Sequence, residues 1–350
     1  MMRIAVRVDA APRIGGGHLA RCLVFATALR REGAAVTFVC RADDSALTAP
    51  LRTSGFPVCW LPLSSACTPA QDAAATRAAL TGAYDWLIVD HYGLDAGWER
   101  ALRARARRIL ALDDLADRPR DCDLLLNPNL PAHPARYRGL VPSACRLLLG
   151  PEYALLREEF FCARVQPRPR DGRVNRLLVS FGGSDPGNAT ARALTALELL
   201  ARAGELHGIG IDVIAGPGHS EWQALRVQTQ TLPHARFRRA TRQMARFIAA
   251  ADLAIGAGGG SLWERCFLGL PALVVTLADN QHAASAVLAA RGACWHLGPA
   301  ATLAPPALAQ QVAALLHDPA AVRAAAAVAL TVVGAAAFSR HPLRWLRDMQ

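Results

Sequence analysis

A histidine follows three glycines near the start of the chain, in the stretch RIGGGHLARC at residues 13–22. An apolar run precedes the glycines and a helical pattern follows them, so His18 is expected at a helix start, where the helix dipole disfavours imidazolium. A neutral imidazole there suits a general base, although a histidine that only caps or solvates the helix start is an equal alternative. Gly16 and Gly17 would let a ligand approach the backbone closely. Asp9, just after the apolar run, is a further candidate substrate contact.

A second loop reads VDHYGLD and places Asp90, His91 and Tyr92 at the carboxyl end of a predicted strand. Parallel α/β sheets bind their ligands at such ends, so these side chains are candidates to contact a sugar or its leaving group. The alternatives are structural: Asp90 would cap the next turn and Tyr92 would pack between domains. Either Asp9 or His91 could also assist His18.

A third loop, SFGGSDPGN, also follows a predicted strand. Gly182, Gly183 and Ser184 would form a backbone concavity that fits a nucleotide or a phosphate. A turn that ends with Asn188 as a helix cap explains the same residues without a ligand.

The fourth loop, GAGGGSLWERC, places glycines and a serine before a helix. Gly259, Gly260 and Ser261 could offer several amide groups to a diphosphate, and Glu264 could accept hydrogen bonds from both ribose hydroxyls. The alternative is a capping box, in which Ser261 and Glu264 only stabilise the start of the helix.

The next predicted loop adds Asn280 and Gln281 beside the fourth one. A nucleoside diphosphate leaves without an acid catalyst if amides and a helix dipole absorb its charge, whereas a sugar alkoxide leaves poorly. One base for water then suffices, which suits a lone His18. Since no His, Asp or Glu cluster has metal-ligand spacing, the sequence predicts neither a metal nor a cofactor.

The composition limits the classes of partner. The net charge is +11, but all 39 basic residues are arginine, scattered without aromatic interleaving, so nucleic-acid binding is not predicted. The absence of lysine excludes a P-loop lysine and a lysine Schiff base. Nine cysteines without a C-x-x-C pair indicate a reducing compartment. With no secretory pattern and no run long enough to span a bilayer, we expect a cytoplasmic monomer that does not insert into membranes.

Apolar runs alternate with helical patterns along the whole chain, which predicts an α/β protein of two doubly wound Rossmann-type domains whose parallel sheets face a central cleft. Predicted strands lie at 3–8, 35–40, 57–61, 86–90, 108–114, 176–181, 210–216, 252–256 and 271–276. The predicted domain plan is an N-terminal domain at 1–165, a linker at 166–174, a second Rossmann-type domain at 175–335 and a C-terminal helix or tail at 336–350.

Together these stretches resemble the UDP-2,4-diacetamido-2,4,6-trideoxy-β-L-altropyranose hydrolases of pseudaminic acid biosynthesis, and the chain is similar to the spore-coat polysaccharide proteins and to MurG-like GT-B glycosyltransferases. The stretches that carry the resemblance are IGGGHLARC, LIVDHYGLD, LALDDLADR, CDLLLNPN, YRGLVPSACRLLLGPEYALLREEF, VSFGGSDPGN, IGAGGGSLWERCFLGLPALVV and DNQHAASAVLAARG.

The resemblance implies a GT-B-like fold and metal-independent, inverting hydrolysis of the anomeric C–O bond of the UDP-sugar. UDP and 2,4-diacetamido-2,4,6-trideoxy-L-altrose would be released, as in the nonulosonic acid pathways of flagellin glycosylation and cell-surface polysaccharides. It also implies that His18 is the water-activating base, and that Asn280, Glu264 and Arg157 contact the substrate. The resemblance further implies that the domain at 175–335 is a UDP-binding domain. Two alternatives remain: a GT-B glycosyltransferase with a sugar or lipid acceptor, and a non-catalytic nucleotide-sugar-binding protein.

Overall fold

The computed structural model describes residues 1–11, 15–43, 47–165, 168–334 and 341–348. The chain forms two compact units. Unit 1 consists of Met1–Leu155 with Ala336–Gln350, and unit 2 consists of Leu156–Ala335. Both units contain the alternation of strands and helices that the apolar runs predict.

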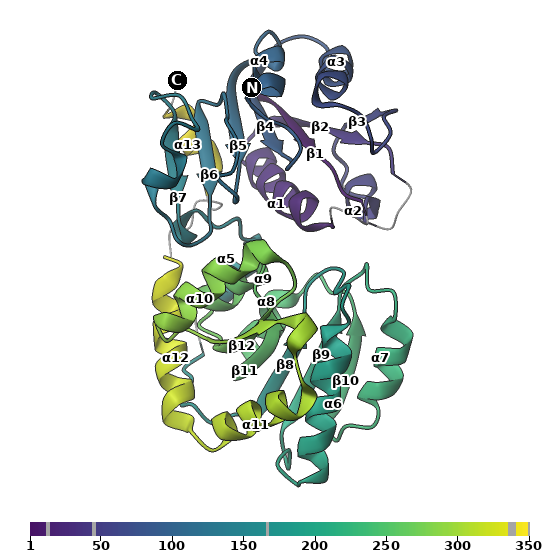
Figure 1. Cartoon of the computed structure of the whole chain (residues 1–350), viewed down its shortest axis with the longest axis vertical. Helices are drawn as coiled ribbons and strands as arrows, with labels where there is room; N and C mark the ends of the chain where they lie inside the picture. Colours follow the sequence, from purple (N-terminus) through teal and green to yellow (C-terminus); the bar gives the residue numbers. More distant parts are fainter. Residues whose placement is uncertain (12–14, 44–46, 166–167, 335–340, 349–350) are drawn as a thin grey trace. The chain divides into compact units, whose positions relative to one another are not determined.

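Unit 1 is built on a seven-stranded sheet with the order β3-β2-β1-β4-β5-β6-β7 (Figure 1). Every adjacent pair in it is parallel. Its elements are β1 (Arg3–Val8), α1 (Gly17–Arg31), β2 (Ala35–Arg41), α2 (Ala49–Arg52), β3 (Val58–Leu61), α3 (Pro69–Ala79), β4 (Tyr84–Asp90), α4 (Ala96–Leu102), β5 (Ala106–Leu112), β6 (Leu124–Asn127), η1 (Pro134–Tyr137), β7 (Arg146–Leu149), η2 (Pro151–Tyr153) and α13 (Pro342–Arg347). The strand order reverses between β1 and β4, and ligands of such sheets bind outside the carboxyl ends of the strands at that point.

Both faces of this sheet are buried because successive side chains of a strand point to opposite sides. On β1, Val6 packs with residues of α1 and α13, whereas Ala5 packs in the cluster that contains Trp98 of α4 and Ala73 of α3. Phe25 of α1 is 1% exposed. The continuous apolar runs of this half are thus explained by helices on both faces.

Unit 2 is built on a six-stranded parallel sheet with the order β10-β9-β8-β11-β12-β13. Its elements are α5 (Glu158–Arg164), β8 (Arg176–Ser180), α6 (Ala189–Arg202), β9 (Gly210–Ala215), α7 (Trp222–Thr229), β10 (Ala235–Arg239), α8 (Met244–Ala250), β11 (Leu253–Ala257), α9 (Ser261–Phe267), β12 (Ala272–Thr276), η3 (Asp279–Gln281), α10 (His282–Ala290), β13 (Trp295–Pro299), η4 (Ala300–Thr302), α11 (Pro305–Leu316) and α12 (Pro319–Val332). Its order reverses between β8 and β11, so this sheet has its own switch point.

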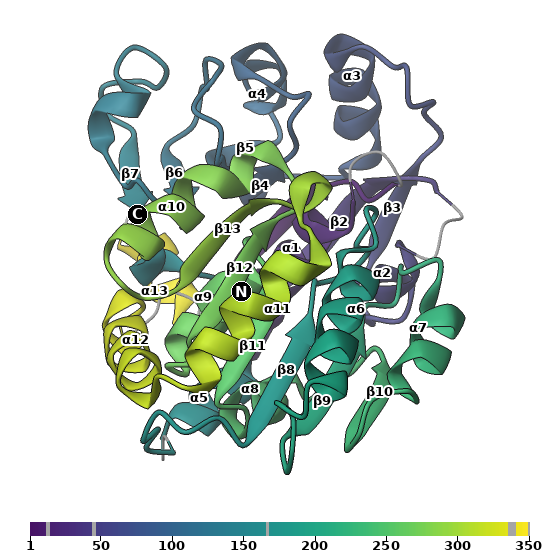
Figure 2. The same ribbon diagram turned by 60° about the horizontal axis from the view of Figure 1, so that its bottom comes forward.

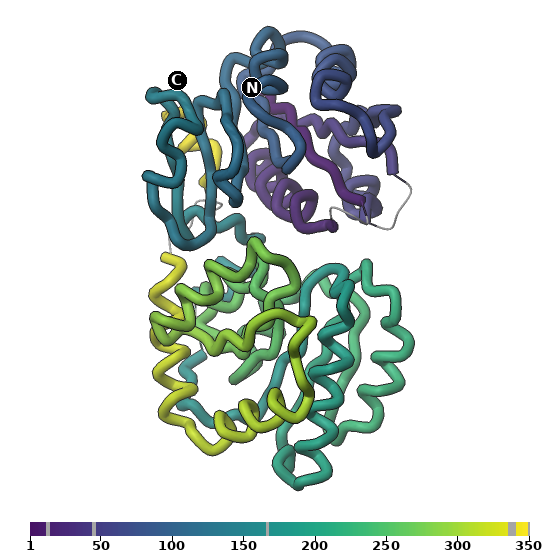
Figure 3. The backbone as a smooth tube through the Cα atoms, in the orientation of Figure 1, coloured from purple at the N-terminus to yellow at the C-terminus, as the bar shows by residue number. Residues whose placement is uncertain are grey.

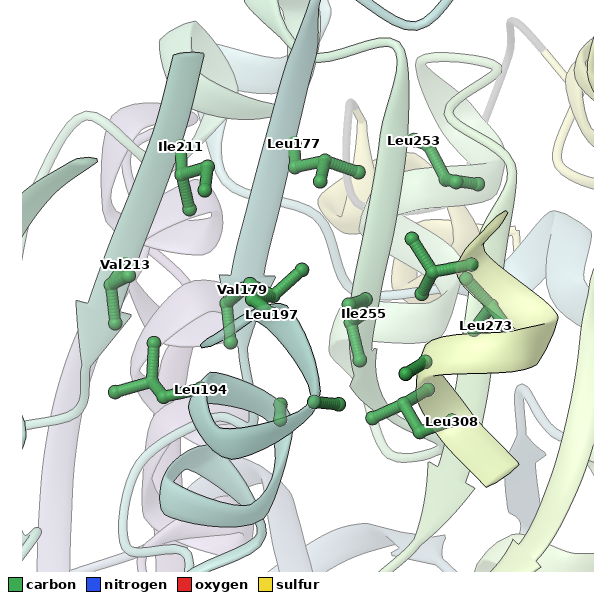
Figure 4. Close-up of a cluster of buried hydrophobic side chains, with 14 of the residues drawn as sticks. Leu177, Val179, Leu194, Leu197, Ile211, Val213, Leu253, Ile255, Leu273 and Leu308 are labelled. Atoms are coloured by element: carbon green, nitrogen blue, oxygen red, sulfur yellow. The ribbon is translucent and has the colours of Figure 1, made fainter. Parts of the chain in front are cut away.

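Helices α6 and α11 lie over one face of this sheet (Figure 2). Figure 4 shows Leu194 and Leu197 of α6 and Leu308 of α11 directed toward the strand residues Val179 and Ile255. The alternate strand residues, such as Leu178, are also buried, so the opposite face is covered as well.

The boundary between the units differs from the predicted domain plan. Helix α5, expected in the N-terminal domain, belongs to unit 2: Phe161 packs edge-on against Phe267 with ring centroids 5.2 Å apart, and Arg164 donates to the carbonyl oxygen of Leu330 at 3.1 Å. The predicted linker therefore lies inside unit 2, with residues 166–167 outside the described ranges.

The end of the chain returns to unit 1. Figure 3 shows the last described segment, 341–348, among the strands of that unit. Leu343 and Leu346 of α13 are buried in its core, and Trp345 contacts Tyr153 with ring centroids 5.7 Å apart. The predicted tail is thus a helix of unit 1 over 342–347, whereas residues 335–340 and 349–350 lie outside the described ranges.

All nine predicted strands are present, with ends that agree to within two residues. The described residues contain four further strands that were not predicted: β6, β7, β10 and β13. The sequences of β6 and β7, LLLN and RLLL, are leucine runs too short to distinguish a strand from a helix. Strand β10 reads ARFRR at the edge of its sheet, where exposed arginines hide the apolar pattern.

Across the described ranges, no single helix is long and apolar enough to cross a membrane. Helices α11 and α12 pass that test only as a pair, and the chain bends by 93° between them.

Candidate functional site

His18 and Asp90 face each other across the switch point of unit 1. His18 is the second residue of α1, which follows β1, and Asp90 is the last residue of β4, paired in register with Val8. The Nδ1 atom of His18 lies 2.5 Å from Oδ1 of Asp90. Asp90 is fully buried and His18 is 6% exposed. Two adjacent strands and one helix therefore bring together residues that are 72 positions apart.

The contact with Asp90 determines which nitrogen of His18 carries the proton. An ionised carboxylate only accepts hydrogen bonds, and its contact with Nδ1 is the shortest that this atom makes, so we assign the proton to Nδ1 and the lone pair to Nε2. Nη2 of Arg21 also lies 3.1 Å from Nδ1, but a guanidinium only donates, so with this tautomer that approach is not a hydrogen bond. Burial by itself would raise the pKa of Asp90, but the charge of Arg21 and the hydrogen bonds that Asp90 accepts from Arg21 and His18 outweigh it and hold that pKa well below its usual range. This arrangement of a base oriented by a buried carboxylate is the one that catalytic histidines use.

Arg21 and Asp114 extend this pair into a network. Arg21, one turn after His18, donates from Nε to Oδ2 of Asp90 at 2.5 Å and from Nη2 to Oδ1 at 2.6 Å. Its Nη1 lies 3.3 Å from Oδ2 of Asp114, which also accepts a hydrogen bond from the Tyr92 hydroxyl at 3.2 Å. The Tyr92 ring meets the His18 ring edge-on, with centroids 4.4 Å apart. Tyr92 thus contacts His18 and is also exposed to solvent, with 37% of its surface accessible.

Three expectations for this edge need correction. Asp90 was expected to contact a sugar or cap a turn, but it is fully buried and orients His18 instead. Asp9 does not assist His18, because Arg7 and Arg41 bind its carboxylate, at 2.6 Å from Arg7 Nη1 and 2.5 Å from Arg41 Nε. His91 points to that same carboxylate, with Nε2 3.2 Å from Oδ2 of Asp9.

The glycine loop before His18 forms the start of α1. Gly16 is the N-cap residue and Gly17 the first residue of the helix, and no side chain caps it. Gly15 adopts a φ of +77°, which favours glycine, and its N–H donates to Ala11 at 2.8 Å. Residues 12–14 of the predicted loop lie outside the described ranges.

The second glycine loop lies at the switch point of unit 2, between β11 and α9. Among the described residues, the N–H groups of Gly259, Gly260 and Ser261 have no hydrogen-bond acceptor, as expected for the start of a helix. A Cβ atom on Gly258 would lie 2.4 Å from Oγ of Ser285, which explains why this position is glycine. The loop therefore presents three backbone N–H donors, and the residues beneath them are closely packed.

A buried arginine lies beneath this loop. Arg265 is 3% exposed, donates from Nη2 to the carbonyl oxygen of Ala257 at 2.6 Å and from Nη1 to Oγ of Ser261 at 3.2 Å. Burial lowers the pKa of its guanidinium. No carboxylate in the described part of the chain forms an ion pair with it, and its Nε has no acceptor there. Sequence reasoning missed Arg265; its spacing of four residues from Ser261 was the available signal.

The capping-box alternative for this helix is wrong. The N-cap residue of α9 is Gly260, and no side chain caps the helix. Glu264 instead lies 3.3 Å from Nη2 of Arg157, the N-cap residue of α5. Burial raises the pKa of the Glu264 carboxyl, and Arg157 partly offsets that effect. Two residues that the family resemblance implicated are thus in contact within unit 2.

The loop after β8 contains the helix cap at Asn188 that the sequence predicts as the alternative to a phosphate site. Asn188 is the N-cap residue of α6 and accepts a hydrogen bond from the Ala191 N–H at 3.2 Å. The carboxylate of Asp185 accepts from the N–H groups of Ala189 and Thr190 at 2.9 and 2.8 Å, so an acidic side chain already occupies this helix start.

The predicted phosphate concavity of that loop packs against the loop after β9. A Cβ atom on Gly216 would lie 2.2 Å from the carbonyl oxygen of Gly182 and 2.3 Å from that of Gly183. The side chain of Ser184 is half-buried. The N–H groups of Gly182, Gly183 and Ser184 have no hydrogen-bond acceptor among the described residues, and their exposure is similar to that of Gly259, Gly260 and Ser261. Binding of a phosphate by Gly182, Gly183 and Ser184 stays a prediction.

Asn280 and Gln281 lie in η3, after β12, which pairs with β11. Asn280 is exposed. Gln281 accepts a hydrogen bond from the Leu277 N–H at 2.9 Å, and its amide nitrogen would be 3.4 Å from a Cβ on Gly259. Gln281 is therefore beside the second glycine loop, as the order of the loops predicted.

Most of the predicted residues thus gather in two places, one in each unit; the exceptions are Asp9, which is paired with Arg7 and Arg41, and Gly182, Gly183 and Ser184 in the loop after β8. In unit 1 these are Gly16, Gly17, His18 and Tyr92, to which the structure adds Arg21, Asp90 and Asp114. In unit 2 these are Arg157, Gly259, Gly260, Ser261, Glu264, Asn280 and Gln281, to which it adds Arg265. Within the described ranges, no group of three or more His, Cys, Asp and Glu residues is arranged to hold a metal ion.

Residues 177–337, nearly all of unit 2, match the glycosyltransferase family 28 C-terminal domain. A curated protein of Campylobacter jejuni, the UDP-2,4-diacetamido-2,4,6-trideoxy-beta-L-altropyranose hydrolase, is 29% identical over 197 residues, which are 56% of this chain and 66% of that protein. The chain is related to this UDP-sugar hydrolase. The resemblance predicted from the sequence is thereby confirmed.

Two further comparisons concern a second sequence relative and the fold. The spore coat polysaccharide biosynthesis protein SpsG of Bacillus subtilis is 30% identical over 163 residues, 47% of each chain. The crystal structure of MurG from Acinetobacter baumannii superposes with a TM-score of 0.66 over 99% of both chains at 15% identity, which confirms the GT-B fold class. The matched stretches span between about half and just under two thirds of the curated relatives' own lengths.

Proposed function

We propose that the chain binds a UDP-sugar and hydrolyses its anomeric C–O bond, with UDP-2,4-diacetamido-2,4,6-trideoxy-β-L-altropyranose as the substrate. The single observation that carries this proposal is the hydrogen bond between Nδ1 of His18 and Asp90, which leaves Nε2 as a proton acceptor at the switch point of unit 1. The relationship to the Campylobacter hydrolase supports the choice of substrate.

In the proposed step, a water oxygen attacks C1 of the sugar on the side opposite the UDP. Nε2 of His18 accepts a proton from that water, and Asp90 stabilises the imidazolium that forms. The C1–O bond breaks, and its electron pair leaves with the β-phosphate oxygen of UDP. The products are UDP and the free sugar, whose anomeric configuration is inverted at the moment of release.

The proposal assigns the nucleotide to the glycine loop of unit 2. The N–H groups of Gly259, Gly260 and Ser261, which have no acceptor within the described part of the chain, are suitable donors to a diphosphate. The buried charge of Arg265 favours an anion above the loop. Glu264 is suited to accept hydrogen bonds from the ribose, while Asn280, Gln281, Tyr92 and Arg157 are proposed substrate contacts.

Hydrolysis in ¹⁸O-labelled water tests the reaction directly. The purified chain is incubated with the UDP-sugar and EDTA, without an acceptor, and the products are followed by NMR and mass spectrometry. We expect the label at C1 of the sugar, unlabelled UDP and an inverted initial anomer. Label in the phosphate of UDP would contradict cleavage of the C1–O bond, and inhibition by EDTA would contradict a metal-independent step.

The match to the glycosyltransferase family 28 domain favours one competing function, transfer of the sugar to an acceptor other than water. The same experiment distinguishes the two reactions. A transferase would release UDP only when a sugar or lipid acceptor is added, and the product would carry no ¹⁸O.

A further inference from the structure

Among the described residues, which do not include 12–14, the network around His18 joins two carboxylates to one permanent cation, Arg21, whose Nη2 also lies 3.1 Å from Nδ1 of His18. Asp90 on β4 and Asp114 after β5 are both ionisable acids, and Arg21 on α1 contacts both of them. The other titratable groups that face this network are Tyr92 and Cys22, whose Sγ lies 3.5 Å from Asp90. Burial and the neighbouring carboxylates raise the pKa of both the Tyr92 hydroxyl and the Cys22 thiol, so both groups stay neutral.

This arrangement has a net charge that depends on His18. With a neutral imidazole, two carboxylates and one guanidinium leave one negative charge in the network. When His18 takes a proton, the network becomes neutral. Because the side chains of Asp90, Asp114 and His18 are all more than nine-tenths buried, water screens these charges only weakly.

Asp114 is the source of the excess charge. Arg21 binds Asp90 at 2.5 and 2.6 Å but Asp114 only at 3.3 Å, so its charge mainly offsets that of Asp90. The second oxygen of Asp114, Oδ1, is buried and has no hydrogen-bond partner among the described residues. An asparagine would satisfy the contacts to Arg21 and Tyr92 equally well, with its oxygen in the place of Oδ2, and would not bury an unpaired negative charge.

We propose that Asp114 is a positioning residue that acts on His18 through charge: its carboxylate favours the protonated imidazole and so strengthens His18 as a base. The inference rests on the proposed role of His18 in hydrolysis. Accepting a hydrogen bond from the Tyr92 hydroxyl needs no charge on residue 114. The inference therefore assigns Asp114 a second role that does need the charge.

An NMR titration of His18 tests this inference without substrate, so its outcome is independent of whether the chain hydrolyses a UDP-sugar. The imidazole resonance of His18 is assigned with His18→Gln, and the pH at its midpoint is compared between the wild type and Asp114→Asn. We expect the midpoint to fall in Asp114→Asn, because a buried carboxylate of the same network has been neutralised. Asp85→Asn serves as the matched control, because Asp85 lies at the opposite end of β4, about 17 Å along the strand. It should leave the midpoint unchanged.

Arg21→Gln provides a test of opposite sign if Asp114→Asn does not fold. It removes the one permanent cation that the described residues place in this network, so the midpoint should rise. In an active preparation, the acidic limb of kcat/KM should move in the same direction as the midpoint for each variant. A midpoint that is the same in Asp114→Asn and in the wild type, or that falls in Arg21→Gln, would overturn the inference.

Discussion

The two units present the same local design at their switch points, a parallel strand followed by glycines and a short helix start, but they surround it with opposite charge. In unit 1 the helix start holds His18 over Asp90, with an excess carboxylate at Asp114. In unit 2 the helix start exposes backbone donors over Arg265, a buried guanidinium without a carboxylate partner among the described residues.

The difference shows that a glycine-rich helix start does not by itself define a function. The N–H groups and the dipole of either helix favour an anion. A carboxylate in direct contact with His18 exerts a stronger local field than a helix dipole, which is equivalent to roughly half a charge at each end. Unit 1 is therefore suited to stabilise a cation that forms on a base, and unit 2 to hold an anion.

The largest expected effect comes from removing the base in unit 1. His18→Gln should lower kcat by about 10²–10⁴-fold, because the proposed mechanism assigns the proton of the attacking water to His18. The affinity for UDP, measured by calorimetry, should not change, because the nucleotide is assigned to unit 2. A kcat within twofold of the wild type would remove His18 from the mechanism.

The next effect concerns the group that orients His18. Asp90→Asn should lower kcat by roughly 10²-fold, because an amide neither stabilises an imidazolium nor secures Nδ1–H as the donor. Arg3→Gln, which alters a contact at the amino end of the sheet, is the matched control and should retain full kcat. Equal kcat values for Asp90→Asn and the wild type would show that unit 1 does not use the Asp90 carboxylate to stabilise a cation on His18.

A third prediction tests the packing beneath the loop of unit 2. Gly258→Ala should lower the free energy of unfolding by about 1–3 kcal/mol, because its Cβ would lie 2.4 Å from Oγ of Ser285. Ser285→Ala in the same chain should restore most of the loss. Gly187→Ala, where the new Cβ meets no heavy atom within 4 Å, is the control and should stay within about 0.5 kcal/mol in chemical denaturation.

A fourth prediction tests the charge beneath the same loop. Arg265→Met should weaken UDP binding about tenfold, equivalent to about 1.4 kcal/mol, because the loop loses its buried positive charge. Arg226→Met, on the exposed side of α7, should leave the affinity unchanged. Calorimetric titration with UDP measures both, and an unaltered affinity in Arg265→Met would place the diphosphate elsewhere.

The smallest expected effect is on stability at acidic pH. The folded-state pKa of Asp90 is lowered, so its charged form stabilises the fold fully above the unfolded-state pKa of about 4, and this contribution is lost as the pH falls further. The difference in unfolding free energy between the wild type and Asp90→Asn should therefore shrink between about pH 4 and pH 2. A difference that stays constant over this range, in urea unfolding monitored by circular dichroism, would contradict the lowered pKa.

Much of the fold was predictable because parallel strands that are buried on both faces have continuous apolar sequences. The elements that were missed carry weaker signals: β6 and β7 are four-residue leucine runs, and β10 carries arginines at an open edge. The two aspartates of LALDD were placed inside a predicted strand, but β5 ends at Leu112, which puts Asp114 in the loop beside Arg21.

The sequence by itself determined the fold class, the relationship to the UDP-sugar hydrolase and the glycine loops, because each of these depends on residue order within one segment. Only the tertiary structure decided that Asp90 orients His18, that Arg7 and Arg41 engage Asp9, and that Glu264 meets Arg157. Those pairings depend on which strands are neighbours and how far each strand extends. Hydrogen bonds act over about 3 Å, so a shift of one residue at a strand end decides which carboxylate a histidine meets.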